Sequence, residues 1–236
     1  MKQEKKNYIV VVAAGSGSRY GGDLPKQFCG LCGRPLLMTT LERVHGCAPE
    51  AEVLLVLSGG MMGYWRDVCA DLGFEGVRVT VVDGGASRAE SVRNALRLVD
   101  PLTVGWIAVH DGARPMVDGV MFGRLLEGLE GCSGVIPAVA VTDSLRVVEA
   151  DGSSRSVDRS RLRAVQTPQV FDGVRLLRAN EGELLETFTD DASVMEAAGY
   201  CDLRLVDGDP RNIKVTNPGD IAIVEMYLSA EGCGQA

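Results

Sequence analysis

The sequence has few of the features that mark membrane and secreted proteins. Aromatic residues make up 5% of its 236 residues, and no run of about 18 apolar residues is present that could cross a membrane. Its first residues, MKQEKKN, lack the apolar core of a secretion signal. We therefore expect a cytoplasmic protein with no membrane partner.

Cysteine is present but forms no recognisable framework. The seven cysteines are an odd number scattered along the chain, unlike the paired sets of small disulfide-rich proteins. Cys29 and Cys32 have a CxxC spacing, but no second pair follows at the distance of a zinc site. This pattern favours a reducing compartment and free thiols.

Positive charge is also scarce. The chain has 24 Lys and Arg against 32 Asp and Glu, which makes its net charge −8. This balance argues against a broad nucleic-acid surface, so we expect no nucleic-acid partner. An anionic substrate would have to meet a local cluster of cations.

Buried strands alternate with helices through the first part of the chain. Apolar, β-branched runs predict strands over 8–12, 51–57, 77–82, 104–109 and 134–141, and helices over 35–46, 61–72, 89–99 and 117–129. Short turns between them imply right-handed crossovers. The fold class is therefore α/β, a Rossmann-like, mainly parallel sheet with helices on both faces.

The alternation stops after residue 141. Residues 144–149 and 153–158 predict a polar hairpin, which we interpret as an arm over about 142–165 that projects from the domain. Helices over 172–180 and 218–228, another after Thr189, and short strands over 203–206 and 213–215 follow. Pro137 suggests an edge strand or a bend. With no repeat and no linker, residues 1–236 form one domain.

The first loop is the most informative stretch. A buried strand gives way to Ala13-Ala14-Gly15-Ser16-Gly17-Ser18-Arg19, and Lys26 follows seven residues later. Small residues let the backbone approach a ligand closely, and bare N–H groups with two cations suit a polyphosphate. A dinucleotide fingerprint would need glycine where Tyr20 stands, and a Walker loop would need Ser or Thr after Lys26.

Further candidates lie where other strands end. Gly85, Ala86 and the hydroxyl of Ser91 could contact a base, and Asp111 is placed to hold a ribose hydroxyl or a metal ion. We expect His110 to be structural. Lys214 alternates with Ile213 and Val215 and therefore points to the opposite side.

The motifs AAGSGSR…PKQ, DGGASRAESV, HDGARP, VTDSLR, VDRSRLRAVQTPQVF, TDDAS and NIKVT occur in this order. Over nearly the whole chain they resemble the 2-C-methyl-D-erythritol 4-phosphate cytidylyltransferases of the non-mevalonate isoprenoid pathway. Ribitol-5-phosphate cytidylyltransferase is the alternative, because it shares the Pro-Lys-Gln and Thr-Pro-Gln segments. Two departures are Gly112, where the family usually has alanine, and Ser144, where it has threonine.

The resemblance implies that CTP and a polyol phosphate are the substrates and that Mg²⁺ or another divalent cation is the cofactor. It places Lys26, Arg19 and Lys214 on the phosphates and Asp111 on the metal ion. The nucleotide would lie against Ala13, Ala14, Gly15, Gly17, Gly85, Ala86, Ser91 and Asp111. The acceptor would meet Arg159, Ser144, Thr167, Thr189 and Arg114, the last of which also orients Asp111.

The resemblance also implies a homodimer in which the arm reaches over the partner's site. Two other functions fit less well. A dinucleotide-dependent oxidoreductase would need an acidic residue after the second strand, where Leu57-Ser58 stands. A nucleotide sensor without catalysis would tolerate the loss of Lys26 and Lys214, and both are present.

Overall fold

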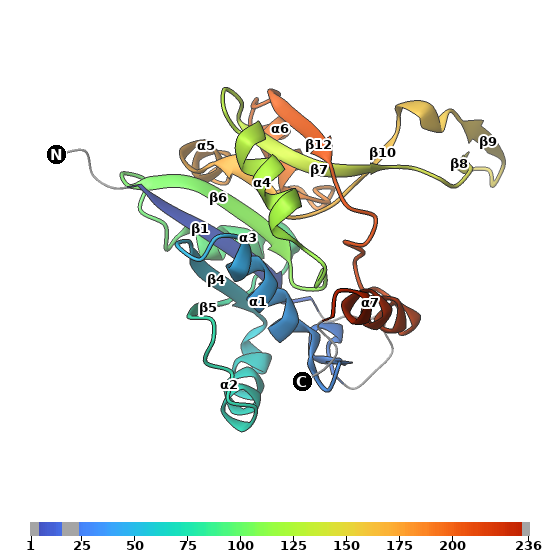
Figure 1. The fold of residues 1–236 in the computed structure, drawn as a ribbon. Coiled ribbons are helices and arrows are strands. Elements are labelled where there is room, and N and C mark those ends of the chain that lie inside the picture. The colour runs from blue at the N-terminus through green and yellow to red at the C-terminus, as the bar shows by residue number, and fades with distance from the viewer. Residues whose placement is uncertain (1–4, 16–23, 233–236) are drawn as a thin grey trace.

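A computed structural model describes residues 5–15 and 24–232 of the chain (Figure 1). An eight-stranded mixed sheet runs through its centre in the order β10-β7-β11-β6-β1-β4-β5, with β12 also pairing with β7. These strands are β1 (Lys6–Ala13), β4 (Glu52–Leu57), β5 (Val79–Asp83), β6 (Val104–Asp111), β7 (Gly134–Ala140), β10 (Arg163–Val165), β11 (Gln169–Asp172) and β12 (Leu203–Asp207). The predicted fold class is confirmed.

Helices cover both faces of the sheet, which explains why β1 is apolar from Tyr8 to Ala13. Ile9 and Val11 belong to the cluster under α1 (Leu36–Cys47), α2 (Met62–Asp71) and α4 (Gly119–Gly128). Tyr8 and Val10 belong to the cluster under α3 (Arg88–Leu96), α5 (Gly173–Ala179) and α6 (Asp191–Ala197). Successive side chains point to opposite faces, so a strand buried on both faces must be apolar at every position.

The remaining elements surround this core. α7 (Gly219–Ala230) packs through Val224 and Leu228 on a small cluster that includes Leu31 and Leu36. β2 (Gly30–Leu31) and β3 (Arg34–Pro35) form a short hairpin after the helical turn η1 (Lys26–Phe28). No helix in the described part of the chain is long and apolar enough to cross a membrane.

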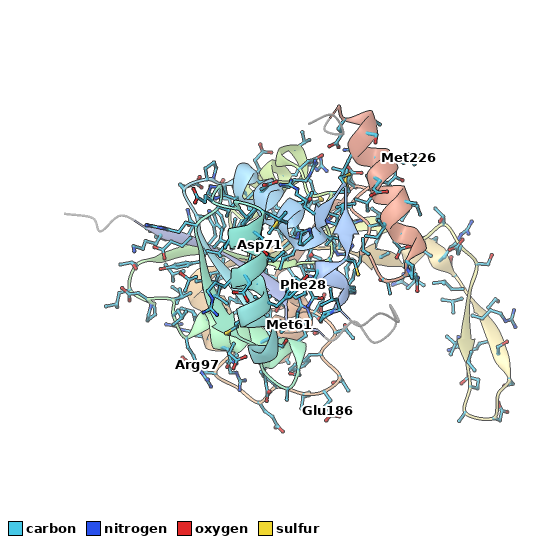
Figure 2. The ribbon with its side chains drawn as sticks, turned by 90° about the horizontal axis from the view of Figure 1, so that it is seen from below. Phe28, Met61, Asp71, Arg97, Glu186 and Met226 are labelled. Carbon is cyan, nitrogen blue, oxygen red and sulfur yellow. The ribbon has the colours of Figure 1, made fainter. Side chains whose placement is uncertain are left out.

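The arm is the hairpin of β8 (Leu145–Val148) and β9 (Ser154–Val157), followed by the turn η3 (Arg159–Arg161). It stands clear of the body in Figure 1 and again in Figure 2, where the view is turned by 90°. The chain rejoins the main sheet at β10, which pairs antiparallel with β7. Leu145 and Val148 on the arm are 37% and 72% exposed.

Three expectations about strands differ from the structure. Residues 213–215 form no strand. Val215 N–H donates to the carbonyl of Ala113, but the segment does not go on to pair with a neighbouring strand. β7 is not an edge, since β12 lies on one side of it and β10 and β11 on the other. Proline has no N–H to donate to a neighbouring strand. Pro137 is tolerated in β7 because it faces the non-strand residues between β10 and β11, where its carbonyl accepts from Gln166 N–H.

The third difference is that the sequence analysis did not predict β2, β3, β10 or β11. Of these, β11 is the most central. It lies between β6 and β7, antiparallel to both. Its residues Val170 and Phe171 are fully buried, so two apolar residues were too short a pattern to identify a central strand.

Gly134 offers a test of this packing. A Cβ there would lie 2.3 Å from Cδ1 of the buried Phe171 ring, so Gly134→Ala should lower the free energy of unfolding by about 1–3 kcal/mol. Gly123 in α4 has open space, and Gly123→Ala should raise it by roughly 0.5–1 kcal/mol. Denaturant unfolding measures both variants. Equal stability of Gly134→Ala and the natural chain would contradict the close approach of β7 and β11.

Candidate active site

A cavity of about 480 Å³ opens at the carboxyl ends of the parallel strands, the place where ligands bind in such sheets. Its walls come from the loops after β1 and β5, from η1, from the end of β6 and from the segment before α7. The described lining residues are Val12, Ala13, Ala14, Gly15, Lys26, Gln27, Gly85, Ala86, Ser87, Arg88, Ser91, Asp111, Ala113 and Lys214. We call it the nucleotide cavity, after the ligand predicted for these residues.

Most of the predicted nucleotide residues lie together in this cavity. Ala13, Ala14 and Gly15 line it from the loop after β1, and Gly85 and Ala86 from the loop after β5. Gly17 and Arg19 lie outside the described residues. The two loops approach closely because residue 84 is glycine: a Cβ there would lie 2.5 Å from the Cβ of Ala14.

The loop after β5 is held in shape by the first turn of α3. Ser87 caps the helix, accepting a hydrogen bond from Glu90 N–H at 3.1 Å. Ser91 Oγ accepts from Gly85 N–H at 3.0 Å and donates to the Ser87 carbonyl at 2.8 Å. The Ser91 hydroxyl, predicted to contact the base, is thus already bonded within the loop and defines its shape.

Gln27 fastens the loop after β1. Its side chain is 3% exposed, and its Nε2 donates to the carbonyls of Ala13 at 2.6 Å and Gly15 at 3.2 Å. These bonds satisfy backbone carbonyls at the point where the chain leaves the sheet. The neighbouring Lys26 lines the same cavity as Arg88 and Lys214.

Asp111 is the centre of the charged groups in the cavity. Its Oδ1 lies 3.4 Å from Nε of Arg88, while its Oδ2 lies 3.3 Å from Nε of Arg114 and 2.9 Å from Nζ of Lys214. Burial alone would raise the pKa of Asp111, but these three cations outweigh burial and hold that pKa well below its usual range. The carboxylate is therefore ionised at neutral pH.

A chain of hydrogen bonds supports Asp111 from behind. Its backbone N–H donates to Thr167 Oγ1 at 2.9 Å, and Thr167 Oγ1 lies 3.1 Å from Nδ1 of His110. His110 Nε2 lies 3.0 Å from the carbonyl of Arg114, which can only accept. Nε2 therefore carries the proton, and Nδ1 accepts from the Thr167 hydroxyl.

His110 is fully buried, and burial lowers its pKa to about 4, which keeps the ring neutral at physiological pH. This agrees with the structural role expected for it. Thr167 is 4% exposed with its hydroxyl bonded inside the chain. Its predicted contact with the acceptor stays a prediction.

Lys214 reaches Asp111 because the residues on either side of it are anchored. Asn212 is fully buried, its Nδ2 donates to the Thr167 carbonyl at 2.8 Å, and its own carbonyl accepts from Arg114 Nη1 at 2.9 Å. Val215 is fully buried and bonded to Ala113. The predicted orientation of Lys214 is confirmed, although the segment is not a strand.

A second, smaller cavity of about 90 Å³ adjoins the first. We call it the acceptor cavity, again after the predicted ligand. Its lining includes three of the predicted acceptor residues, Thr167, Thr189 and Arg114, together with Asp190 and Gln169. Gln169 is fully buried and joins β11 to the start of α6, donating to Asp190 Oδ2 at 2.8 Å and accepting from Ala192 N–H at 3.1 Å.

The other two predicted acceptor residues lie elsewhere. Ser144 and Arg159 are exposed at the arm, and neither is among the described residues that line the two cavities. Arg159 donates to the carbonyl of Thr142 within the arm. A single chain therefore does not bring Ser144 and Arg159 to the cavities.

The donor set around Asp111 decides what kind of metal site is possible. The described residues contain no group of three or more His, Cys, Asp or Glu side chains that could hold a metal ion. A carboxylate offers about four lone pairs, and Asp111 uses one on Oδ1 and two on Oδ2. One lone pair on Oδ1 therefore remains to bind Mg²⁺. Mg²⁺ usually takes one or two carboxylates and fills its shell with phosphates and water.

Comparison with known proteins identifies this arrangement. The family model of 2-C-methyl-D-erythritol 4-phosphate cytidylyltransferase matches residues 8–230. The chain belongs to this family. A cytidylyltransferase of that name from Bacteroides thetaiotaomicron is 41% identical over 223 residues, which cover 94% of this chain and 100% of the relative. One from Bacteroides fragilis is 40% identical over 219 residues, covering 93% and 98%.

Solved structures agree with the cytidylyltransferase family. The crystal structure of 4-diphosphocytidyl-2C-methyl-D-erythritol synthase from Anaerococcus prevotii has a TM-score of 0.78 at 26% identity, covering 95% of this chain and 99% of that one. The cytidylyltransferase from Francisella tularensis also has a TM-score of 0.78 at 26% identity, covering 95% and 100%. The family predicted from the motifs is confirmed.

Several residues that shape this cytidylyltransferase site were not identified from the sequence. Gln27, Asn212, Gln169 and Asp191 are all buried, and each bonds two segments that are distant in the chain or irregular in backbone. All four lie inside the motifs found in the sequence, but a motif does not specify which partner a polar side chain bonds. Only the folded chain supplies the partners.

The buried imidazole predicts a pH dependence of stability. In the unfolded chain His110 binds a proton below its ordinary pKa of 6.5, whereas in the folded chain it does so only below about 4. The free energy of unfolding should therefore fall as the pH falls from 6.5 to 4, by about 1.4 kcal/mol per unit of pKa difference. Asp111, whose folded pKa is depressed, loses its contribution mainly at lower pH.

Chemical unfolding at several pH values measures this dependence. His110→Gln removes the titrating group and should flatten the decline between pH 6.5 and 4, whatever its effect on stability at pH 7. An equally steep decline in that variant would show that other groups cause it.

Proposed function

We propose that this chain transfers the cytidylyl group of CTP to 2-C-methyl-D-erythritol 4-phosphate, releasing pyrophosphate and 4-diphosphocytidyl-2-C-methyl-D-erythritol. The observation that supports this most is the joining of the two cavities. Lys26 lines the nucleotide cavity, Thr189 and Arg114 line the acceptor cavity, and Asp111 and Lys214 line both. Two anionic substrates could thus meet beside the same cations.

The reaction requires alignment rather than a protein nucleophile. An oxygen of the acceptor phosphate attacks the α-phosphorus of CTP, a new phosphorus–oxygen bond forms, and the bond to the β-phosphate breaks as pyrophosphate leaves. Negative charge accumulates on the phosphate oxygens in the transition state. We assign its stabilisation to Lys26, Lys214 and Arg19, since fixed cations in a partly enclosed site act strongly on developing charge.

Mg²⁺ is part of the proposal, with Asp111 as its protein ligand. A bound Mg²⁺ would neutralise phosphate charge and orient the triphosphate. The remaining lone pair on the Asp111 carboxylate supports this assignment, and Arg88 and Arg114 hold the carboxylate in place from two sides. A cytoplasmic location also belongs to the proposal, which suits the six described cysteines, all of them free thiols.

Pyrophosphate release from CTP tests this function directly. The purified chain is offered 2-C-methyl-D-erythritol 4-phosphate and ribitol 5-phosphate in separate reactions with Mg²⁺. We expect release with the first and little with the second. Release with ribitol 5-phosphate alone would replace the proposed acceptor, and no release with either would overturn the proposal.

Lys26 provides a prediction about the chemical step. If its charge acts mainly on the transition state, Lys26→Ala should lower kcat by roughly 10²–10³, the loss typical of one such donor. The affinity for CTP should fall far less. Steady-state kinetics and CTP titration measure the two effects. A variant with normal kcat and a raised KM would show that Lys26 only binds the ground state.

The arm supports a homodimer as the functional unit. A two-stranded hairpin is marginally stable alone, and its two exposed edges are prone to pairing with other chains. Here the hairpin carries exposed Leu145 and Val148 and holds Arg159 and Ser144 away from its own cavities. We propose that these two residues serve the acceptor cavity of the partner subunit in a two-fold dimer.

Mixing two inactive variants tests this arrangement. Lys26→Ala and Arg159→Ala are each expected to be inactive alone. A heterodimer of the two has one site with Lys26 from one chain and Arg159 from the other, so random reassortment should restore about a quarter of full activity. Mass measurement confirms that subunits have exchanged. An exchanged mixture without activity would show that Arg159 does not act across the interface.

A further inference from the structure

Three charged residues line both the nucleotide cavity and the acceptor cavity: Arg88, Asp111 and Lys214. They form the wall between the two. Asp111 and Lys214 already have direct assignments in the proposed reaction. Arg88 has so far been assigned only to hold the Asp111 carboxylate, and its contacts extend further than that.

Arg88 bonds to carboxylates that belong to two different elements. Its Nε lies 3.4 Å from Oδ1 of Asp111 at the end of β6, and its Nη2 lies 2.8 Å from Oδ2 of Asp191, the first residue of α6. The planar guanidinium presents donors in a fixed fork, so one side chain can hold both carboxylates at once. A lysine has a single charged nitrogen and cannot reproduce this geometry.

Among the described residues, the side-chain partner of Asp191 is Arg88, and Asp191 also places a negative charge in the first turn of α6. Its side chain is 2% exposed and is not among the described residues that line either cavity. Burial raises the pKa of Asp191, and the charge of Arg88 opposes that rise. A buried carboxylate is costly unless it is paired, so its presence here needs a structural reason.

The ion pair of Arg88 with Asp191, which we call the bridge, joins segments that belong to the two substrate cavities. Arg88 is the first residue of α3, directly after the nucleotide-cavity residues Ala86 and Ser87. Asp191 follows Thr189 and Asp190, which line the acceptor cavity. A displacement of α6 relative to α3 would therefore move the acceptor residues relative to the nucleotide loop.

We propose that Arg88 is a positioning residue that couples the two substrate sites by holding the start of α6 against Asp111 and the nucleotide loop. The inference rests on the proposed cytidylyl transfer, because that reaction needs the acceptor phosphate in line with the α-phosphate. Asp191 is its anchor. Neither residue needs to contact a substrate for this role.

Arg88→Lys and Asp191→Asn test the coupling, together with the double variant. Misalignment should lower kcat roughly 10- to 10²-fold and raise the KM for the acceptor about tenfold in each single variant. The dissociation constant for CTP, measured without acceptor, should stay within about threefold in Asp191→Asn, because Asp191 is not among the described lining residues and the bonds of Gln27, Ser87 and Ser91 remain. The double variant should be no worse than either single one, as expected for residues that act as a pair.

Arg97→Lys is the matched control. Arg97 lies at the end of the same helix, is exposed and bonds to Asn94, and the substitution makes the same chemical change outside the wall. It should leave kcat, both KM values and CTP binding unchanged. Thermal melts of all variants show whether each is folded. If Asp191→Asn does not fold, Asp191→Glu keeps the charge but shifts its position, and it must show the same loss of kcat and rise in acceptor KM.

Two results would overturn the coupling. If Arg88→Lys weakens CTP binding strongly while Asp191→Asn does not, Arg88 contacts the nucleotide directly. If both variants keep natural kcat and acceptor KM, the bridge has no part in alignment. Either result leaves cytidylyl transfer intact, whereas an inactive natural chain would refute the proposed function itself.

Discussion

The site depends on the ionised carboxylate of Asp111, which is held at the end of β6 among three cations. Arg88 comes from α3, Arg114 from the loop after β6, and Lys214 from the segment before α7. Each cation is partly withdrawn from water and needs a counter-charge, and Asp111 supplies it to all three. One carboxylate thereby brings together segments that are separated by up to 126 positions in the chain, from Arg88 to Lys214.

Buried amides perform the corresponding task for the irregular backbone around the site. Gln166 exchanges hydrogen bonds with Asp209, donating to its carbonyl at 2.8 Å and accepting from its N–H at 3.1 Å. Gln27 and Asn212 satisfy carbonyl groups in two other loops. Because a side-chain amide can both donate and accept hydrogen bonds, it can bond to backbone groups in a loop that has no neighbouring strand. Buried side-chain hydrogen bonds thus hold loops that form most of the site.

The charge of the whole molecule contrasts with that of the site. The chain carries a net charge of −8, yet Lys26, Arg88 and Lys214 line the nucleotide cavity beside the single described carboxylate of Asp111. An acidic protein can therefore bind polyanions where cations converge at strand ends. Local geometry, more than the total charge, decides what such a site attracts.

The sequence by itself determined the alternation of strands and helices, because apolar periodicity specifies how each element is buried. It also determined that small residues and cations follow β1, and that Asp111 ends β6. It did not reveal β11, whose antiparallel insertion between β6 and β7 depends on partners rather than on its own four residues. Strand propensity is largely a matter of what lies alongside.

The tertiary structure alone decided which polar groups meet. Arg88 and Asp191 are 103 positions apart, and Thr167 and His110 are 57 apart, so no spacing in the sequence links them. The proton on Nε2 of His110 is assigned by the Arg114 carbonyl it faces. Hydrogen bonds and ion pairs depend on distances of about 3 Å in space, and a sequence records only order along the chain.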